Sequence, residues 1–379
     1  MIIISIIITF LYLFLIGCFV YGFDKVKSFY LENIPAKTKF SIIIPFRNEA
    51  ENLPDLLKSI ELLQYPKHLF EIIFVDDDSD DNSVTILKHF INSRPLDCAQ
   101  GNMLIIKSER HSNSPKKDAL TTAIKKAKYD WIITTDADCI LPKCWLGSFD
   151  EFIQKTNPKC IVAPVAYVKQ KLFLHKFQLL DILSLQGVTI GGFGINKPFL
   201  CNGANFAYQK ALFKELNGFN GNTNIASGDD IFFLEKVLKS YPKQLDYLKC
   251  EQAIVTTISQ PTWKHLLSQR IRWAAKTSAY NNWFGKLAGL IVLLMNALII
   301  IGLLLSVLSV FNYKIWLYTL IIKLSIDFFL IYKSANFFNQ KNILTSYFLC
   351  FLVYPFFSVY VAFISVFSNY KWKGRHFKK

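Results

Sequence analysis

Residues 70–81 read FEIIFVDDDSDD, a mostly apolar run that passes without a break into a cluster of acidic residues. Short runs rich in β-branched and aromatic residues, bounded by turn residues, are typical of β-strands. The last three residues, 79–81, are explained as the capped start of a following helix. Asp76 and Asp77 are explained less well in this way, because they follow directly on apolar residues. The stretch therefore predicts a strand with functional carboxylates at its end.

Further strands are predicted on either side of this stretch, at residues 40–44, 103–107 and 131–135. Helical patterns lie between the strands, at residues 49–63, 82–91 and 117–128, with Asn48 as the expected cap of the first helix. Strands that alternate with helices predict a Rossmann-like α/β domain with parallel strands. In such sheets ligands bind beyond the carboxyl ends of the strands, so the residues that follow each strand are the candidates for function.

Asp136 and Asp138 follow the strand predicted at 131–135. Alternation along an extended segment places both carboxylates on the same side, where they repel each other unless a cation lies between them. One or two carboxylates together with diphosphate oxygens are a usual ligand set for Mg²⁺ or Mn²⁺. We therefore expect Asp138 to be the direct metal ligand, and Asp136 to divide its contacts between the metal and the ribose of a nucleotide.

Five segments occur in an order that resembles the family-2 inverting glycosyltransferases with the GT-A fold. The segments are Pro45-Phe46-Arg47-Asn48-Glu49, Val75-Asp76-Asp77-Asp78-Ser79, Asp136-Ala137-Asp138, Gly228-Asp229-Asp230 and Gln269-Arg270-Ile271-Arg272-Trp273. They cover residues 41–273, and the last matches the family's Gln-x-x-Arg-Trp signature in full. Asp229 departs from the family's commoner Glu.

The resemblance implies an enzyme that transfers a sugar from a nucleotide-diphosphate sugar in one in-line displacement, with Mg²⁺ or Mn²⁺ as cofactor. By the resemblance, Asp230 is the general base that takes the proton from the acceptor hydroxyl. The residues expected at the donor nucleotide are Pro45, Phe46, Arg47, Glu49, Asp76, Asp77, Lys117 and Asp136. The residues expected at the acceptor and the diphosphate are Asp229, Gln269, Arg270, Arg272 and Trp273.

The later motifs also have structural interpretations. Residues 228–230 are compatible with a simple helix start. On a helix, Gln269, Arg272 and Trp273 share one face while Arg270 points elsewhere. That face suits a diphosphate and an acceptor, and it equally suits an amphipathic helix that lies on a membrane.

Three other segments have a functional interpretation, and two of them also have a structural alternative. Lys117 is explained equally well as a solvated lysine. Residues 199–206 correspond to the family's acceptor-side loop, in which Gly203 permits close approach of the backbone. Residues 172–190 predict an interfacial helix, with an ordinary core helix as the alternative.

The composition, 52% hydrophobic and 15% aromatic, indicates membrane segments. Residues 2–21, 287–311 and 343–367 are uncharged and long enough to cross about 30 Å of hydrocarbon. A fourth stretch, 315–332, contains Lys323 and Asp327, whose spacing allows them to pair on one helix face. We expect this weak segment to lie at the interface or to re-enter, because the positive-inside rule then leaves the basic tail in the cytosol.

The expected organisation is an N-terminal transmembrane anchor (1–23), a cytosolic GT-A domain with interfacial helices (24–285), a transmembrane region of two to three helices (286–370) and a basic tail (371–379). A secretory signal is the alternative for the first segment, since Leu15-Ile16-Gly17-Cys18 resembles a lipoprotein cleavage box. The long apolar run and the absence of a basic n-region favour the anchor. We expect a multi-pass protein of the cell inner membrane, in contact with membrane lipids.

Several classes of function are disfavoured. The net charge of +15 is spread along the chain, and no nucleic-acid-binding module is found, so nucleic acid is not an expected partner. The eight cysteines form no CxxC pair and the six histidines have no ligand spacing, which argues against zinc. The expected acceptor is lipid-linked or a glycan. A processive polysaccharide synthase and a non-catalytic nucleotide-sugar-binding membrane scaffold remain as alternatives.

Overall fold

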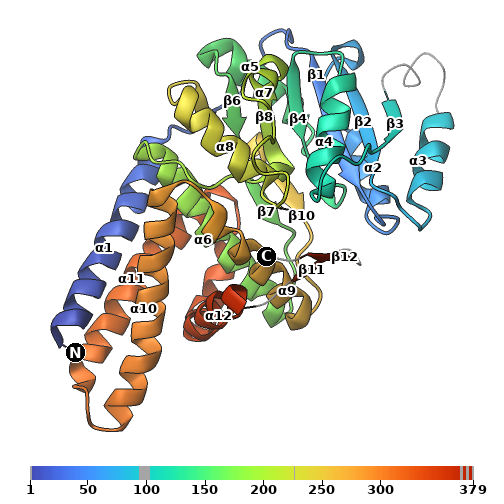
Figure 1. Cartoon of the computed structure of the whole chain (residues 1–379). Coiled ribbons are helices and arrows are strands. Elements are labelled where there is room, and N and C mark those ends of the chain that lie inside the picture. Colours follow the sequence, from blue (N-terminus) through green and yellow to red (C-terminus); the bar gives the residue numbers. More distant parts are fainter. Residues whose placement is uncertain (1, 94–102, 226, 368–369, 373–374, 378–379) are drawn as a thin grey trace.

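The computed structural model describes residues 2–93, 103–225, 227–367, 370–372 and 375–377 of the 379-residue chain. A seven-stranded sheet forms the centre of the upper half in Figure 1. Its strands, in sheet order, are β3 (Met103–Lys107), β2 (Phe70–Asp76), β1 (Phe40–Phe46), β4 (Trp131–Thr134), β8 (Phe206–Gln209), β6 (Cys160–Val162) and β9 (Leu245–Tyr247). The first four are parallel, and β8 runs antiparallel to both β4 and β6.

Helices connect these strands, and the first three lie close to the places that the sequence predicted. They are α2 (Leu53–Glu61), α3 (Ser83–Asn92), α4 (Pro115–Lys126), α5 (Trp145–Thr156), α7 (Lys210–Glu215) and α8 (Asp229–Ser240). The expected cap of the first helix is wrong, because Asn48 has a left-handed backbone (φ 52°) and α2 begins only at Leu53. The Asn48 side chain instead accepts a hydrogen bond of 3.0 Å from the backbone N–H of Asp80. It thereby joins the loops that follow β1 and β2.

A second, three-stranded sheet lies beside the first. It consists of β5 (Cys139–Ile140), β10 (Val255–Thr257) and β7 (Val165–Tyr167), with β10 in the middle. β5 directly follows the Asp136–Asp138 segment, and β10 leads toward α9 (Trp263–Ala275). The small sheet therefore fixes the metal-binding candidates relative to the helix that carries the Gln-x-x-Arg-Trp motif.

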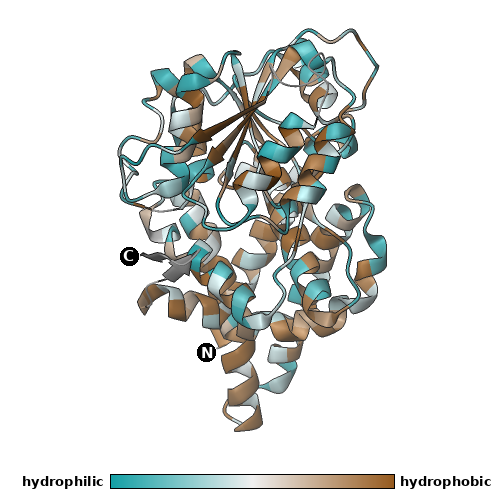
Figure 2. Cartoon of the chain, turned by 90° about the vertical axis from the view of Figure 1, so that its right-hand side faces the viewer, coloured by the Kyte–Doolittle hydropathy of each residue, from teal (hydrophilic) through white to brown (hydrophobic). Residues whose placement is uncertain are grey.

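Among the residues that the structure describes, four helical segments are long and apolar enough to cross a membrane. They are α1 (Ile2–Lys25), α10 (Trp283–Val307), α11 (Tyr313–Phe337) and residues 341–367, which contain α12 (Tyr347–Phe367). In Figure 1, α1, α10 and α11 run side by side below the sheet. Figure 2 shows these lower helices as mostly hydrophobic, whereas the loops around the sheet are mostly hydrophilic. The chain thus has an apolar helical half and an α/β half.

The expectation for residues 315–332 is wrong, because this segment belongs to the continuous 25-residue helix α11, which packs against α1 and α10. The predicted pairing of Lys323 and Asp327 is confirmed, with 2.6 Å between the ammonium nitrogen and the carboxylate. The hydroxyl of Tyr12 on α1 donates a second bond of 2.6 Å to Asp327. Both charges are therefore paired inside the bundle, which lowers the cost of burying them in an apolar helix.

α12 is the segment that departs from the direction of the other membrane helices. In Figure 1 it is seen nearly end on, whereas α1, α10 and α11 run lengthwise. Before α12, the Gln340 amide donates a 3.0 Å hydrogen bond to the Tyr167 carbonyl of β7. After it, β11 (Tyr370–Trp372), which pairs with β12 (Arg375–Phe377), lies beside α9. Both flanks of α12 therefore lie on the α/β side of the molecule.

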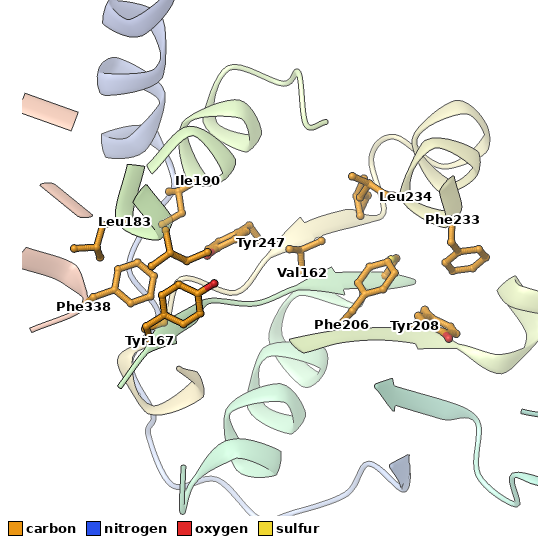
Figure 3. Packing of buried hydrophobic residues seen from close by; sticks show 14 of the residues in the cluster. Val162, Tyr167, Leu183, Ile190, Phe206, Tyr208, Phe233, Leu234, Tyr247 and Phe338 are labelled. Atoms are coloured by element: carbon orange, nitrogen blue, oxygen red, sulfur yellow. The ribbon is translucent and has the colours of Figure 1, made fainter. Parts of the chain in front are cut away.

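α6 (Phe173–Gly194) joins the two halves. It is a helix at the predicted place, but it is largely buried, as expected for the core-helix alternative. Figure 3 shows Leu183 and Ile190 of α6 close to Phe338 at the end of α11 and to Tyr247 of β9. The same apolar cluster continues through Phe206 to α8. One continuous core therefore fixes the α/β half against the membrane helices.

Glycines allow α1 and α6 to cross with their backbones in contact. A Cβ atom on Gly22 would lie 2.2 Å from the Gly191 carbonyl oxygen, and a Cβ atom on Gly194 would lie 1.8 Å from the Gly22 carbonyl oxygen.

We expect Gly22→Ala to destabilise the protein by at least the roughly 1–3 kcal/mol typical of overpacking. The measurement is thermal unfolding in detergent. Gly17→Ala on the same helix is the matched control, since nothing lies within 4 Å of a Cβ atom added at Gly17. An equal loss of stability in both variants would contradict the close backbone contact between α1 and α6.

Candidate active site

A cavity of about 860 Å³ opens at the carboxyl ends of β1, β2 and β4. This is the sheet edge at which the sequence predicted the site. The predicted residues that line it are Pro45, Phe46, Arg47, Glu49, Asp77, Asp136, Asp138, Asp229, Asp230, Gln269, Arg270, Arg272 and Trp273. Two predicted residues, Asp76 and Lys117, are not among the lining residues.

Asp77 is the carboxylate of the β2 end that faces the cavity. It is buried and forms an ion pair with Arg110, and the guanidinium of Arg47 donates to its backbone carbonyl over 3.2 Å. Asp76 instead accepts a 2.9 Å hydrogen bond from the backbone N–H of Ser79 and so closes the turn. The structure therefore separates the two neighbours, with Asp77 facing the site and Asp76 shaping the loop.

Lys116, and not the predicted Lys117, is the lysine of α4 that reaches the cavity. Its ammonium lies 2.7 Å from Asp136 and 3.7 Å from Asp229. Burial opposes the charge of Lys116, but the carboxylates of Asp136 and Asp229 prevail and raise its pKa. A charged ammonium thus joins the donor-side carboxylate to the acidic pair that begins α8.

Lys117 points in another direction because the adjacent position on a helix is rotated by about 100°. Its ammonium donates to the carbonyls of Asn222 and Ile225, over 2.7 and 2.9 Å, and lies over the ring of Phe232. Burial lowers the pKa of Lys117 to about 8. Lys117 therefore supports the loop before α8 and does not line the cavity, so its predicted contact with the nucleotide stays a prediction.

Asp229 and Asp230 begin α8, after Gly228 in a left-handed conformation (φ 82°). Asp229 is buried, and burial raises its pKa despite the opposing charge of Lys116. Asp230 is half-buried and accepts hydrogen bonds of 2.9 Å from the Gly203 N–H and 2.8 Å from the Ile231 N–H. The two N–H groups hold the Asp230 carboxylate at the start of α8, beside the loop that contains Gly203.

Gly203 lies against this acidic pair, as the sequence indicated for a close backbone approach. A Cβ atom at this position would lie 3.2 Å from Asp229 and within 3.6 Å of the Asp230 carboxylate. The Gly203 carbonyl also accepts a 2.7 Å bond from the Thr134 hydroxyl at the end of β4. The loop is therefore attached to both the donor strand and the base candidate.

α9 presents all four polar residues of its motif to the cavity. Arg270, which was expected to point elsewhere, is buried in an ion pair of 2.7 Å with Asp181 on α6, and its guanidinium lies 4.2 Å from the ring centre of Trp273. Arg272 donates to the Ser227 hydroxyl over 3.2 Å. Arg270 thus orients the Trp273 ring, while Arg272 stays near the acidic pair.

Asp136 and Asp138 fit a divalent ion in the chemistry of their donors. Both carboxylates line the cavity from one short segment, and hard oxygen ligands suit Mg²⁺ or Mn²⁺. Over the described residues, no group of three or more His, Cys, Asp or Glu side chains is assembled to hold a metal ion. Two carboxylates completed by diphosphate oxygens are therefore the arrangement that these residues allow.

The far side of the cavity is apolar and lies at the membrane helices. Leu290 and Leu293 of α10 and Val361, Ala362 and Val366 of α12 line it. Exposed apolar surface of this kind inside a helical membrane region is suited to hydrocarbon. The cavity thus runs from carboxylates at one end to an apolar wall at the other.

Comparison with known proteins identifies the family. Residues 41–217 match the family described as "Glycosyl transferase family 2", and residues 131–366, more than half of the chain, match "Glycosyl transferase family group 2". The chain belongs to the family described as "Glycosyl transferase family group 2". This confirms the resemblance seen in the sequence motifs.

Curated relatives of this glycosyltransferase are bacterial. Probable glycosyltransferase YdaM of Bacillus subtilis is 27% identical over 250 residues, covering 64% of this chain and 56% of YdaM. Poly-beta-1,6-N-acetyl-D-glucosamine synthase of Staphylococcus epidermidis is 25% identical over 280 residues, covering 69% of this chain and 61% of that protein. The glycosyltransferase therefore spans less than two thirds of the length of either relative.

Among solved structures, mannosyltransferase PcManGT from Pyrobaculum calidifontis, determined in complex with GDP-Man and Mn²⁺, is similar with a TM-score of 0.57. The match covers 97% of this chain and 99% of that one at 15% sequence identity. It confirms the α/β GT-A fold of the glycosyltransferase.

Among the residues that sequence reasoning missed are Lys116, Asp181, Lys276 and Tyr280, which line the cavity, and Arg110, which pairs with Asp77. Lys276 had a detectable signal, since it lies seven residues after Gln269 on the same helix face. Arg110 and Asp181 had no detectable signal in the sequence, because Arg110 pairs with Asp77 and Asp181 pairs with Arg270, and both partners are distant in the sequence. Only the folded chain brings these charges together.

We expect Asp181→Asn to destabilise the glycosyltransferase by about 3–5 kcal/mol, because it leaves the buried Arg270 without a counter-charge. Thermal unfolding in detergent measures the loss, with the exposed Asp130→Asn as control. Replacing both partners, as Asp181→Leu with Arg270→Met, should restore most of the stability. If Asp181→Asn were as stable as Asp130→Asn, the ion pair between Asp181 and Arg270 would not be what holds α9 against α6.

Proposed function

We propose that this glycosyltransferase transfers a single sugar, with inversion, from a nucleotide-diphosphate sugar to a membrane-associated acceptor, lipid-linked or glycan. The observation that carries the proposal is the cavity that joins Asp136 and Asp230 to the apolar side chains of α10 and α12. A donor sugar needs only the polar end. An acceptor with a hydrocarbon anchor accounts for the apolar end, because burying that anchor there is favourable.

The residues divide between a donor half and an acceptor half. In the donor half, Asp77 and Arg47 lie where the nucleotide enters, and Asp138 with Asp136 would hold the metal. In the acceptor half, Asp230 removes the proton of the acceptor hydroxyl as its oxygen attacks the anomeric carbon. Trp273 offers an aromatic face to the acceptor. When bound, Mg²⁺ or Mn²⁺ supplies Lewis-acid stabilisation of the leaving diphosphate.

A donor and acceptor screen tests this proposal. Purified full-length protein in lipid nanodiscs is incubated with UDP- and GDP-linked sugars and, in turn, with membrane lipids, polyprenyl phosphates or oligosaccharides. The expected result is nucleotide release that one donor and one membrane-associated acceptor stimulate, with a product that carries one added sugar. Donor binding without transfer to any acceptor would favour the scaffold alternative, and transfer only to soluble acceptors would contradict the membrane assignment.

A processive polysaccharide synthase is the second candidate, favoured by the similarity to the poly-beta-1,6-N-acetyl-D-glucosamine synthase. Product length distinguishes the two. A processive enzyme makes long chains before most of the acceptor is used, whereas a single-sugar transferase never does.

The proposal includes a multi-pass location in the cell inner membrane, with the α/β half facing the cytosol and membrane lipids around α1, α10 and α11. Because both flanks of α12 lie near the α/β half, the proposal assigns the basic tail to the cytosolic side. A tag on that tail should therefore be digested in inverted vesicles and protected in right-side-out cells. The opposite pattern would contradict this topology.

A further inference from the structure

Lys276 extends the polar face of α9 beyond the Gln-x-x-Arg-Trp motif. It follows the helix in a helical conformation, and residues at i, i+3, i+4 and i+7 lie on one side. Gln269, Arg272, Trp273 and Lys276 accordingly all line the catalytic cavity. Only 9% of Lys276 is exposed, so this lysine points inward and not toward solvent.

The charges around Lys276 do not fully balance the positive charge of its ammonium group. Burial lowers its pKa to about 8; Asp230 and Asp229 act to raise it, while Arg272 and Lys116 act to lower it. Tyr280, which lines the same part of the cavity, is uncharged because burial raises its pKa. Within the described part of the chain, Lys276 has no hydrogen-bond acceptor and no carboxylate at ion-pair distance.

The other two buried lysines near the site are satisfied. Lys116 lies 2.7 Å from Asp136, and Lys117 donates to the carbonyl of Asn222 over 2.7 Å. The Lys276 ammonium nitrogen is not among the fully buried polar atoms that lack a partner in the described residues, so it reaches the cavity and is not sealed in the core. Lys276 contributes no ion pair that would explain its place in the fold. An anion that enters the cavity supplies the partner that the chain does not.

We propose that Lys276 binds the diphosphate of the donor and neutralises the charge that develops on it during transfer. This inference rests on the proposed function. In the reaction, the acceptor oxygen bonds to the anomeric carbon and the bond from that carbon to the β-phosphate oxygen breaks, leaving its electron pair on the phosphate. The acceptor proton goes to Asp230. The leaving diphosphate gains one negative charge, and a fixed ammonium stabilises that charge.

Binding of nucleotides without the sugar provides the test. Affinities of the full-length protein for UDP, GDP, UMP and GMP are measured by calorimetry for Lys276→Met and Lys276→Arg. Lys264→Met is the matched control, since Lys264 is an exposed lysine of the same helix that does not line the cavity. We expect Lys276→Met to weaken binding of the preferred diphosphate about 10- to 100-fold, the size of a charge-assisted hydrogen bond.

The same substitution should change binding of the matching monophosphate less than threefold, because the monophosphate lacks the β-phosphate. Lys276→Arg should retain most of the diphosphate affinity, and Lys264→Met all of it. Unchanged diphosphate affinity in Lys276→Met, or equal weakening of monophosphate and diphosphate, would overturn the inference alone. A wild-type protein that binds neither UDP nor GDP would overturn the proposed function as well.

The pH dependence gives a second readout. The charged form of Lys276 binds the anion, so the diphosphate affinity of the wild type should fall as the pH rises through about 8. The nearby charged groups are Asp229, Asp230, Lys116, Arg272 and Lys117, and the pKa of Lys117 is likewise lowered to about 8 by burial. Lys276→Arg should show no such fall up to pH 9, because a guanidinium stays charged. The same fall in both proteins would show that another group causes it.

Discussion

Asp230→Asn is expected to lower kcat about 10³-fold, within the range that general-base catalysis contributes. The asparagine has nearly the same shape and keeps one acceptor for the Gly203 or Ile231 N–H, so the fold should persist. It has no ionised oxygen to take the proton of the acceptor. Donor binding should change little, and KM for the donor should stay within about threefold, because the lost contact acts mainly in the transition state.

Steady-state transfer assays measure this loss, with thermal unfolding and nucleotide binding as checks on the folded state. Asp80→Asn is the matched control, an exposed aspartate of the β2 loop that does not line the cavity. If Asp230→Asn transferred sugar at the wild-type rate, another group would have to be the base. Asp229 would be the first to test, since it lies next in the chain and is more buried.

Removal of divalent ions is expected to abolish transfer, with a loss on the order of 10³-fold if the metal contributes several kcal/mol. Mg²⁺ or Mn²⁺ should restore the activity after chelation. Asp138→Asn should weaken Mn²⁺ binding in the presence of UDP or GDP, which electron paramagnetic resonance detects without any turnover. Asp136→Asn should have a smaller effect on Mn²⁺ binding, since its carboxylate also lies 2.7 Å from Lys116.

Two results would count against this assignment. Full turnover in the presence of excess chelator would remove the metal from the mechanism. Unchanged Mn²⁺ binding in Asp138→Asn would remove Asp138 from the ligand set. Asp80→Asn serves as the comparison, because Asp80 is an exposed carboxylate that does not line the cavity.

Much of the donor half was predictable because its elements are local in the sequence. Each strand and the carboxylates after it lie within about ten residues, so hydrophobic pattern and chain order place them together. Asp77, Asp136 and Asp138 were found in this way. The pattern did not distinguish Asp76 from Asp77 or Lys116 from Lys117, because neighbouring positions differ only in the direction that packing gives them.

The membrane half shows the same limit. Apolar length indicated the four helices, but the sequence selected residues 315–332 as the weak segment because of Lys323 and Asp327. In the structure that charge pair is bonded to Tyr12 inside the bundle, and α12 is the helix that lies across the others. Which helix departs from the bundle depends on contacts between segments hundreds of residues apart.

The sequence by itself determined the α/β class, the family, the apolar helices and most residues at the strand ends, since all of these depend on composition and short-range spacing. Only the tertiary structure decided that Lys116 faces the acidic pair, that Arg270 is paired with Asp181, and that Lys276 is buried without a partner. It also decided that the polar site continues into an apolar space between α10 and α12. The physical reason is that burial and pairing of charges depend on which distant segments pack together, and spacing along one chain does not contain that information.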